Sequence, residues 1–429
     1  MISPRDTDFE IHEGVLVRYR GSGGEITIPA GVREIGDGAF FSCRELRRIT
    51  LPDGLTAIGS RAFFSCEQLS HIELPQGVTR IGSRAFQYCW SLTGLSLPET
   101  VTCIEDETFY GCYGLKQMTI PAKVTHIGPK AFAHCMALKG VALPAGLQRM
   151  EREAFWGCTS LADVTIPEGV TAIGSNAFYG CAALTSIRIP DSVRDLGPYA
   201  FADCTGLRQA AVSDCVAGFS QTFSGCTGLQ AYVVSDRSRR YRAVDGVVFS
   251  RDGRTLIAYP PGRRCLRYDI PDAVTEVGAG AFSGASAQVI LVPAGVKTFS
   301  PLAAEGTGDG DPFVACARAD LAADLGKPIY LGPVEDLPIR QRWRALDGFL
   351  FARRAGLPEM APWQDSYLAY VQQEYAACEK KAWKDEPMLR LLMEQRLLRP
   401  DTARNMLKKY YAAKRADLIA ALSAYLETL

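Results

Sequence analysis

The sequence predicts a repeat solenoid followed by a small all-α C-terminal domain. Three observations lead to this fold class. A segment of 23 residues, first seen at 28–50, recurs along the chain, a Cys follows its central Phe by three residues in every copy, and the hydrophobic period changes to 3.6 near the C-terminus. A fixed period in the twenties is typical of solenoids, in which each repeat buries its apolar face against its neighbours.

Three residue types follow the same period of 23 residues: the Phe of an Ala-Phe step, the Cys after it, and a Pro that follows an apolar residue. The Phe positions are Phe40, Phe63, Phe86, Phe109, Phe132, Phe155, Phe178, Phe201 and then, one residue early, Phe223. Parallel repeats in register place equivalent side chains in columns. We therefore expect the nine Cys that follow these Phe to form a column of small buried side chains. Disulfides between adjacent coils are not excluded by their spacing.

Composition excludes several classes of partner. The chain has 47 basic and 47 acidic residues, which argues against nucleic acid or an anionic membrane surface. It has no apolar run near the roughly 18 to 20 residues of a membrane helix, so no membrane insertion is expected. Its N-terminal residues lack a secretory signal pattern, which favours a cytoplasmic location and leaves surface export by an unrecognised route as the alternative.

Taken in order, residues 1–25 read as an N-terminal β cap with two strands around the glycine-rich turn at 21–24. The solenoid is predicted over residues 26–300. Within each repeat, alternation such as that of Ile72 and Leu74 with His71 and Glu73 predicts a half-buried strand. Gly82 is expected to permit a tight bend before the Ala-Phe step.

The repeat breaks at about 235–269, where Asp252-Gly253 lies between two alternating apolar runs and predicts a hairpin insertion. This insert is either a spacer that restores the register or a binding element. Residues 301–312 read as a linker, and the Asp309-Gly-Asp311 pair is too irregular for a calcium loop.

Residues 313–429 are predicted to form four to five helices. Two apolar stripes are expected, followed by a helix opened by Pro387, a helix capped by Asp401 and a final helix with Leu418 on its buried face. The stripes contain Ile339, Trp343, Leu346 and Leu350, and then Trp363, Tyr367, Val371 and Tyr375. They are typical of a core more than of a ligand site.

The pattern IPxxVxxIGxxAFxxCxxLxxI resembles the BspA-type leucine-rich repeat over residues 26–234 and again over 270–299. The resemblance implies a curved right-handed solenoid with a parallel β-sheet on its concave face. It also implies binding of other macromolecules, often at bacterial cell surfaces. The C-terminal segment is similar to helical segments of some bacterial leucine-rich repeat proteins.

Function is predicted to be that of a non-enzymatic interaction scaffold with a protein partner of unknown identity. No phosphate loop, dinucleotide fingerprint, nucleophile elbow or zinc helix occurs, so no catalytic, cofactor or metal residue is predicted. An exported adhesin is the alternative class, and an enzyme would need residues hidden on the concave face.

Two surfaces are candidates for partner binding. The first is the concave sheet, whose outward positions vary within a fixed frame: Arg48, Thr50, His71, Glu73, Gln117, Thr119, Asp163, Thr165 and Arg188. The second is a convex aromatic stripe just after each Ala-Phe step, with Tyr88 one place further on: Phe41, Phe64, Tyr110, Trp156 and Tyr179. Such a stripe either marks a contact surface or shields the core beneath it.

Overall fold

The computed structural model describes residues 8–300, 313–316 and 328–428, which divide into two compact units. The first runs to Arg264 and includes Glu276–Ser286, whereas the second comprises Cys265–Thr275, residues 287–300 and the C-terminal part of the chain. The predicted linker and its Asp309-Gly-Asp311 pair lie outside the described residues.

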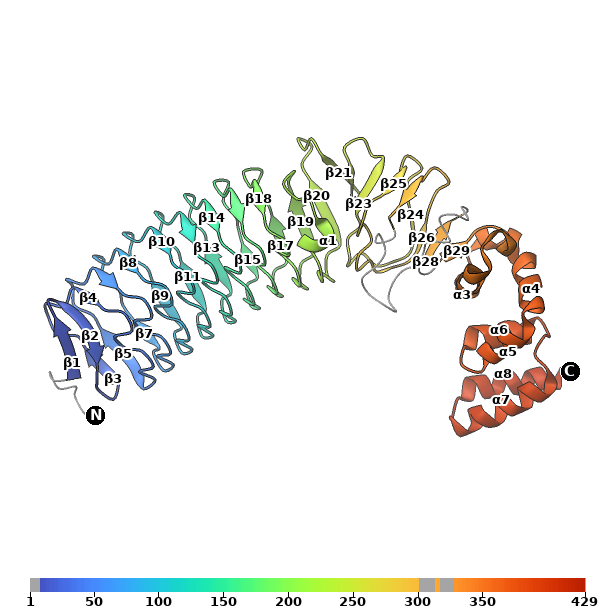
Figure 1. The fold of residues 1–429 in the computed structure, drawn as a ribbon, viewed down its shortest axis with the longest axis horizontal. Coiled ribbons are helices and arrows are strands. Elements are labelled where there is room, and N and C mark those ends of the chain that lie inside the picture. The colour runs from blue at the N-terminus through green and yellow to red at the C-terminus, as the bar shows by residue number, and fades with distance from the viewer. Residues whose placement is uncertain (1–7, 301–312, 317–327, 429) are drawn as a thin grey trace. The chain divides into compact units, whose positions relative to one another are not determined.

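The first unit is a parallel-strand solenoid, as predicted (Figure 1). One strand per coil belongs to the series that we call the main sheet. Its strands pair in register, with Gln117 opposite Gly94 on one side and Gly140 on the other. The strands are β3 (Gly24–Thr27), β5 (Leu46–Thr50), β7 (His71–Ile72), β9 (Gly94–Ser96), β11 (Gln117–Thr119), β13 (Gly140–Ala142), β15 (Asp163–Val164), β17 (Ser186–Arg188), β19 (Gln209–Val212) and β20 (Ala231–Val234).

A second series of short parallel strands runs along another side of the coils, which Figure 1 shows as the upper edge of the solenoid. Each strand ends in a buried aliphatic residue just before the Ala-Phe turn, except Leu196 of β18, which is half-buried. The strands are β4 (Glu34–Ile35), β6 (Ala57–Ile58), β8 (Arg80–Ile81), β10 (Cys103–Ile104), β12 (His126–Ile127), β14 (Arg149–Met150), β16 (Ala172–Ile173) and β18 (Asp195–Leu196).

Phenylalanine rings form the centre of the solenoid core. The repeated Phe from Phe40 to Phe223 are fully buried, and adjacent rings stack almost parallel with centroids 5.2–6.0 Å apart. Offset stacking at this distance is a favourable arrangement for aromatic pairs. Each coil therefore contributes one ring to a continuous column, which one repeat alone cannot form.

The repeated cysteines from Cys66 to Cys226 form the predicted buried column, whereas Cys43 in the first coil is only half-buried. From Cys66 to Cys226, each thiol donates a hydrogen bond to the carbonyl oxygen of the Phe in the preceding coil, with Sγ–O distances of 3.1–3.4 Å. Burial raises the pKa of the Cys112 and Cys158 thiols to about 12. The thiols therefore link coils while remaining poor nucleophiles.

Gly82 has a different purpose from the predicted one. Its φ is not in the left-handed region, so the backbone does not need glycine for a bend. A Cβ at this position would instead lie 2.6 Å from the backbone nitrogen of Ser60 in the preceding coil. Gly174 shows the same close approach, 2.4 Å from the Arg152 nitrogen. These glycines are required because the coils pack backbone to backbone there.

The N-terminal cap contains the two predicted strands on either side of the glycine-rich segment, but these strands belong to different sheets, and the hairpin of the cap is formed with an additional strand. Strand β1 (Phe9–His12) pairs antiparallel with β2 (Val15–Tyr19), and β2 then pairs parallel with β4. The chain turns at Glu13 and Gly14, both with positive φ. The glycine-rich segment at 21–24 instead leads into β3, the first strand of the main sheet. The hairpin covers the open end of the phenylalanine column, because Tyr19 contacts Phe40.

The insertion in the repeat is a three-stranded antiparallel meander, which includes the predicted hairpin. Strand β22 (Val247–Ser250) pairs with both β21 (Tyr241–Val244) and β23 (Thr255–Ala258). Asp252 accepts a hydrogen bond from the Arg254 backbone nitrogen at 3.0 Å, and Gly253 takes a positive φ. A short helix, α1 (Phe219–Thr222), precedes β20 where the repeat spacing shortens.

The second unit joins a parallel sheet to helices. The sheet consists of β24 (Cys265–Asp269), β26 (Ala287–Leu291), β28 (Phe313–Cys316) and β29 (Pro328–Tyr330). The short strand β27 (Thr298–Phe299) also lies in this unit, whereas β25 (Glu276–Val277) belongs to the first unit and pairs with β23. Two 3₁₀ segments, η4 (Val334–Asp336) and η5 (Pro358–Trp363), flank the first of six described helices: α3 (Ile339–Ala355), α4 (Gln364–Gln373), α5 (Tyr375–Ala382), α6 (Glu386–Glu394), α7 (Pro400–Ala412) and α8 (Ala416–Glu427).

The helical stripes are core, as predicted, but some helix ends differ. Leu346, Leu350, Tyr367, Val371 and Leu418 are buried. Trp343, Trp363 and Tyr375 are only half-buried, while the side chain of Ile339 lies outside the described residues. The helix containing Pro387 begins at Glu386 with Asp385 as its cap, because the Asp385 carboxylate accepts a hydrogen bond from Met388.

Asp401 does not cap α7. The cap position is Arg399, and Pro400 occupies the first helical position, where its missing N–H costs nothing. Asp401 lies in the first turn and pairs with Arg404 instead.

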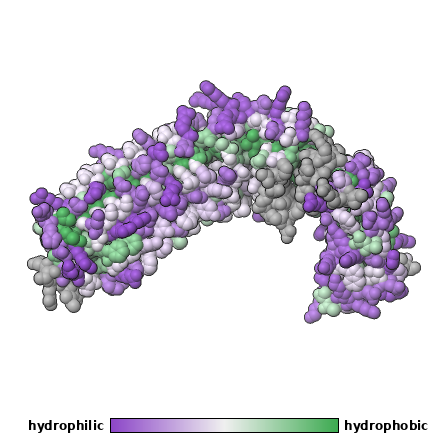
Figure 2. All heavy atoms as spheres, in the orientation of Figure 1, coloured by the Kyte–Doolittle hydropathy of each residue, from purple (hydrophilic) through white to green (hydrophobic). Residues whose placement is uncertain are grey.

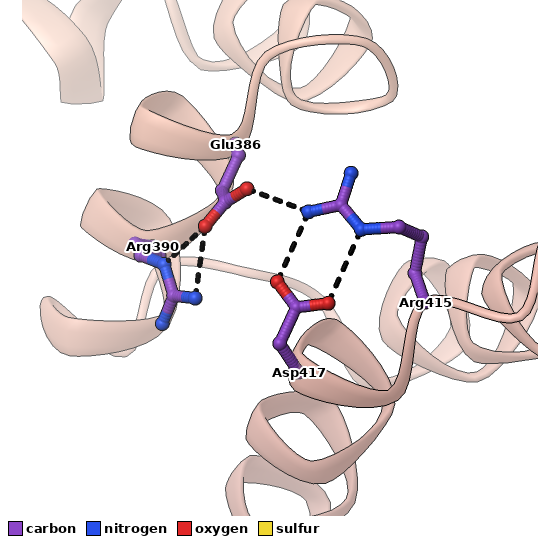
Figure 3. Close-up of polar contacts among 4 residues, drawn as sticks. All are labelled: Glu386, Arg390, Arg415 and Asp417. Carbon is purple, nitrogen blue, oxygen red and sulfur yellow. Dashed lines mark hydrogen bonds and ion pairs between the residues drawn. The ribbon is translucent and has the colours of Figure 1, made fainter.

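Glu386 connects α6 to α8 (Figure 3). Its carboxylate accepts hydrogen bonds from Arg390 on the same helix, at 2.9 Å, and from Arg415 just before α8, at 2.8 Å. The Arg415 guanidinium also binds Asp417 through two hydrogen bonds. These bonds lower the pKa of Glu386, the Arg390 bond contributing most. The cluster fixes how the last two helices meet α6.

Candidate interaction surfaces

The main-sheet face is the first candidate surface. The predicted residues on it are exposed, except His71, which is half-buried. The sheet register brings neighbours together, with Arg48 opposite His71 and Gly140 opposite Asp163. Glu73 and Thr165 follow the ends of β7 and β15 rather than lying within them. All nine predicted positions thus lie along one series of strands, although its concave curvature stays a prediction.

Charged side chains on this face are partly paired with each other. The His71 ring lies 3.0 Å from the Glu73 carboxylate, and Arg188 forms an ion pair with Glu168. Both pairs are exposed, so each contributes little to stability. Between them, the coils of β9 and β13 present small uncharged residues in the same row, namely Gly94, Ser96, Gly140 and Ala142, while Asp163 on β15 is charged. The middle of the main sheet is therefore flatter and less polar than its two ends.

An apolar ridge that the sequence analysis missed lies on these same middle coils. Trp90, Tyr113 and Met136 each follow a repeated Cys and are 43%, 40% and 43% exposed. The Trp90 and Tyr113 rings stack with centroids 6.1 Å apart. The sequence signal that identifies them is their spacing of 23 residues at the position after the repeated Cys, which differs from the position of the predicted aromatic stripe. We call these three residues the apolar ridge.

The predicted aromatic stripe is a continuous chain of ring contacts. Phe41 stacks on Phe64 at 4.7 Å, and the contacts then pass through Tyr88, Tyr110, His134 and Trp156 at 4.6–5.6 Å. Tyr179 leaves this chain and donates a hydrogen bond to Asp203. Phe41 is 55% exposed, whereas the other rings are half-buried. Each ring therefore covers its neighbour, which supports the shielding interpretation over that of an open contact surface.

Backbone geometry explains why the stripe alternates between two positions. Tyr88 and His134 lie two residues after the repeated Phe and take φ values of 61° and 60°. This left-handed conformation is unusual for large side chains. In each following coil the equivalent residue is glycine, Gly111 or Gly157, where a Cβ would lie 2.8 Å from the Tyr88 or His134 ring. Ring and glycine thus form a complementary pair between coils.

The described residues contain no group of three His, Cys, Asp or Glu that could hold a metal ion. Burial lowers the pKa of His134, and Lys130 nearby acts in the same direction. The raised thiol pKa values leave the repeated cysteines unsuited to nucleophilic catalysis. Within those same residues, no helix is long and apolar enough to cross a membrane.

Comparisons with known proteins agree with the fold. A leucine-rich repeat protein of known structure from Bacteroides ovatus is 25% identical, covers 70% of this chain and 82% of its own, and has a TM-score of 0.52. A leucine rich cell surface protein from Faecalibacterium prausnitzii is 27% identical over 70% of this chain and 72% of its own, with a TM-score of 0.41. A leucine rich repeat protein from T. pallidum is 28% identical over 48% and 91%, with a TM-score of 0.37. No curated protein matches the chain.

The sequence of the solenoid matches one family model. The model of the BspA type leucine rich repeat region covers residues 19–139 and 125–242, which together make up more than half of the chain. This match includes the Ala-Phe turns, the cysteine column and both strand series described above. The chain therefore belongs to the BspA-type leucine-rich repeat family.

Proposed function

We propose that this chain is a non-enzymatic scaffold that binds a protein partner through the middle coils of its solenoid. BspA-type repeat proteins generally mediate protein interaction or surface adhesion. The apolar ridge is the observation that carries the proposal for this chain. Trp and Tyr dominate the energetics of protein interfaces and Met is also enriched in them, so three such residues exposed in a row are a candidate hot spot.

The scaffold beneath the ridge is rigid. Cys89, Cys112 and Cys135, which precede the three ridge residues, are fully buried and bonded to the preceding coils. A partner would therefore bind without ordering the backbone, which lowers the entropic cost of association. The small residues of the main sheet on the same coils leave room for a partner to approach.

The proposal is tested with a triple variant, Trp90→Ser, Tyr113→Ser and Met136→Ser. Used as bait in a lysate of the source organism, it should lose the partners that the unaltered chain retains. The matched control is Tyr199→Ser, which removes an aromatic side chain of similar exposure, 42%, from another coil. Retention of every partner by the triple variant would refute the ridge. Glu73→Lys with Arg188→Glu then tests whether the charged ends of the main sheet bind instead.

A cytoplasmic location remains part of the proposal. Its support is that eight repeated cysteines donate hydrogen bonds to carbonyl oxygens, an arrangement that suits a reducing compartment. Cell fractionation tests it, since recovery of the protein from the cell wall or medium would favour the surface adhesin.

A further inference from the structure

The charge of the chain is balanced overall but not near the inserted meander. Residues 235–264 contain eight arginines and three aspartates, whereas the whole chain has 47 basic and 47 acidic residues. Figure 2 shows hydrophilic side chains projecting from the solenoid edge around β21. Such a local excess of guanidinium groups raises the positive potential over one part of the surface.

Some arginines of the solenoid pair with carboxylates of nearby coils, whereas others, such as Arg48, pair with none that the structure describes. Arg44 pairs with Glu67 at 3.1 Å, and Arg84 pairs with Glu107 at 3.0 Å. The guanidinium groups of Arg194, Arg237 and Arg239 form no ion pair with any residue that the structure describes. All three are exposed, so their charges are available to a partner.

The segment that carries these arginines is held in place by its backbone. We call residues 235–240, between β20 and β21, the arginine loop. The Asp214 carboxylate accepts hydrogen bonds from the Arg239 backbone nitrogen, at 2.9 Å, and from the Ser238 hydroxyl. The carbonyl oxygen of Asp214 accepts one from the Arg240 guanidinium at 2.9 Å. Asp214 is therefore engaged with the loop itself, which leaves the side chains of Arg237 and Arg239 available.

Arg240 is fixed further by an aromatic contact. Its guanidinium lies 5.1 Å from the centre of the Tyr241 ring, and the Tyr241 hydroxyl donates a hydrogen bond to the Val216 carbonyl oxygen at 2.7 Å. Cation–π contacts of this kind orient a guanidinium without neutralising it. The loop thus presents arginines from a preorganised backbone.

The arginines surround a hollow in the surface. A concavity of about 590 Å³ is lined by Arg194, Arg237, Arg239 and Arg240 together with Asp191 and Asp214, and by Val193 and Cys215. The four guanidinium groups come from two segments that are more than 40 residues apart, which the stacking of coils brings to one place. Four cations and two carboxylates leave the hollow with an excess of positive charge.

We propose that this hollow docks an acidic segment of a protein partner, with Asp or Glu side chains bound by Arg194, Arg237 and Arg239. The planar guanidinium group binds a carboxylate through two parallel hydrogen bonds, which suits a short peptide with adjacent acidic residues. The inference deepens the proposed function, on which it rests, by giving the partner a chemistry and a second contact site away from the apolar ridge.

A protein segment fits the hollow better than nucleic acid does. Asp191 and Asp195 are exposed beside Arg194, so the positive charge is confined to a short stretch, which suits a few carboxylates better than the regularly spaced phosphates of a long strand. Cys215, which is half-buried, gives the lining a small apolar part that an aliphatic group of a peptide can cover.

The experiment measures binding of a fluorescent oligoglutamate peptide to the full chain by anisotropy at low and at physiological ionic strength. The charge-reversal variant Arg237→Glu with Arg239→Glu should weaken binding by about ten-fold or more, because two charge contacts become repulsive. The matched control, Arg242→Glu with Arg251→Glu, makes the same change of charge on the exposed meander outside the hollow. It should weaken binding by less than about three-fold.

Equal weakening by both variants, or none by the first, would overturn the proposal. Tighter binding of oligothymidylate or of phosphatidylserine vesicles than of the peptide would overturn the assigned partner class. The apolar-ridge variant serves as a reference and should bind the peptide normally. If the ridge variant binds the peptide but loses its lysate partners, the two sites act separately. If the unaltered chain does not bind the peptide, the acidic-segment proposal is wrong, whereas the proposal that the apolar ridge binds a partner still stands.

Discussion

Replacement of Phe109 by Ala tests whether the phenylalanine column holds the coils together. The Phe109 ring is fully buried between Phe86 and Phe132, with centroids 5.6 and 5.3 Å away. Removal of a buried Phe side chain costs about 3–5 kcal/mol, through lost burial and the cavity that remains. Stacking is lost on both faces of the ring, at about 0.5–1.5 kcal/mol for each pair. We therefore expect a cost in the upper part of that range.

The position of Phe109 in the middle of the array adds a second expectation. The stability of a solenoid is approximately a sum of repeat stabilities and nearest-neighbour couplings. A gap at Phe109 weakens the coupling between the coils on either side of it. Urea unfolding followed by circular dichroism should therefore show a lower midpoint together with a shallower or divided transition. Loss of a ring near one end of the array would instead leave most coils unfolding together in one transition.

Phe41→Ala is the matched control for this experiment. It removes the same side chain from the neighbouring column, where the ring is 55% exposed and stacks only on Phe64. Its cost should stay below about 1 kcal/mol. If the Phe109 variant unfolds within about 1 kcal/mol of this control, the rings fill space without coupling the coils, and the reasoning is wrong.

Three further predictions concern the thiols, the glycines and the helical cluster. Burial raises the pKa of the Cys112 thiol from 9.0 to about 12, so the neutral thiol stabilises the fold fully below about pH 9 and this contribution is lost as the pH rises toward 12, which alkaline titration by circular dichroism should show. Thiol reagents at neutral pH should label the buried column from Cys66 to Cys226 only after denaturant is added. Gly111→Ala should destabilise the chain by about 1–3 kcal/mol, because the added Cβ meets the Tyr88 ring and the φ of +69° is unfavourable for alanine. Adding Tyr88→Ala to this variant should restore part of the lost unfolding temperature. The hydrogen bonds from Arg390 and Arg415 lower the pKa of Glu386 below its usual 4.5. The ionised carboxylate therefore stabilises the C-terminal helices above that pH, and this contribution is lost as the pH falls further. In limited proteolysis, the rate at which these helices are cut should rise at acid pH in the unaltered chain, and Glu386→Gln should remove this rise.

The repeated part of the fold was predictable because the chain shows the same environment many times. The repeated Phe, the Cys and the apolar strand residues recur in coil after coil from Phe40 to Cys226, so each copy supports the interpretation of the others. The burial of Phe86 and Cys89 follows from that pattern without a structure. The period shows where a side chain lies, however, and not which bond it makes. The bond from the Cys112 thiol to the Phe86 carbonyl oxygen therefore became visible only in the structure.

Features that occur once were harder to predict. The start of α6 and the cap of α7 depend on local hydrogen bonds, and the sequence pattern therefore led to the wrong cap, Asp401, for α7. The purpose of Gly82 was also misread, since close approach of two backbones leaves no trace in the sequence of either coil. The hollow beside the arginine loop combines segments around Arg194 and Arg237, and no periodic signal connects them.

A repeat array provides its own comparison for deciding which exposed residues the fold requires. A residue that is needed for packing should recur at its position in every coil, as the repeated Phe and Cys do. The position after Cys holds Arg44, Glu67 and Thr159 in other coils, so the fold does not need an aromatic residue there. The apolar ridge is thus a local departure from the repeat, and its triple Ser variant should unfold within about 0.5 kcal/mol per substitution of the unaltered chain. A large loss of stability in that variant would instead show that Trp90 and its neighbours are held for packing, and the ridge would no longer support a binding function.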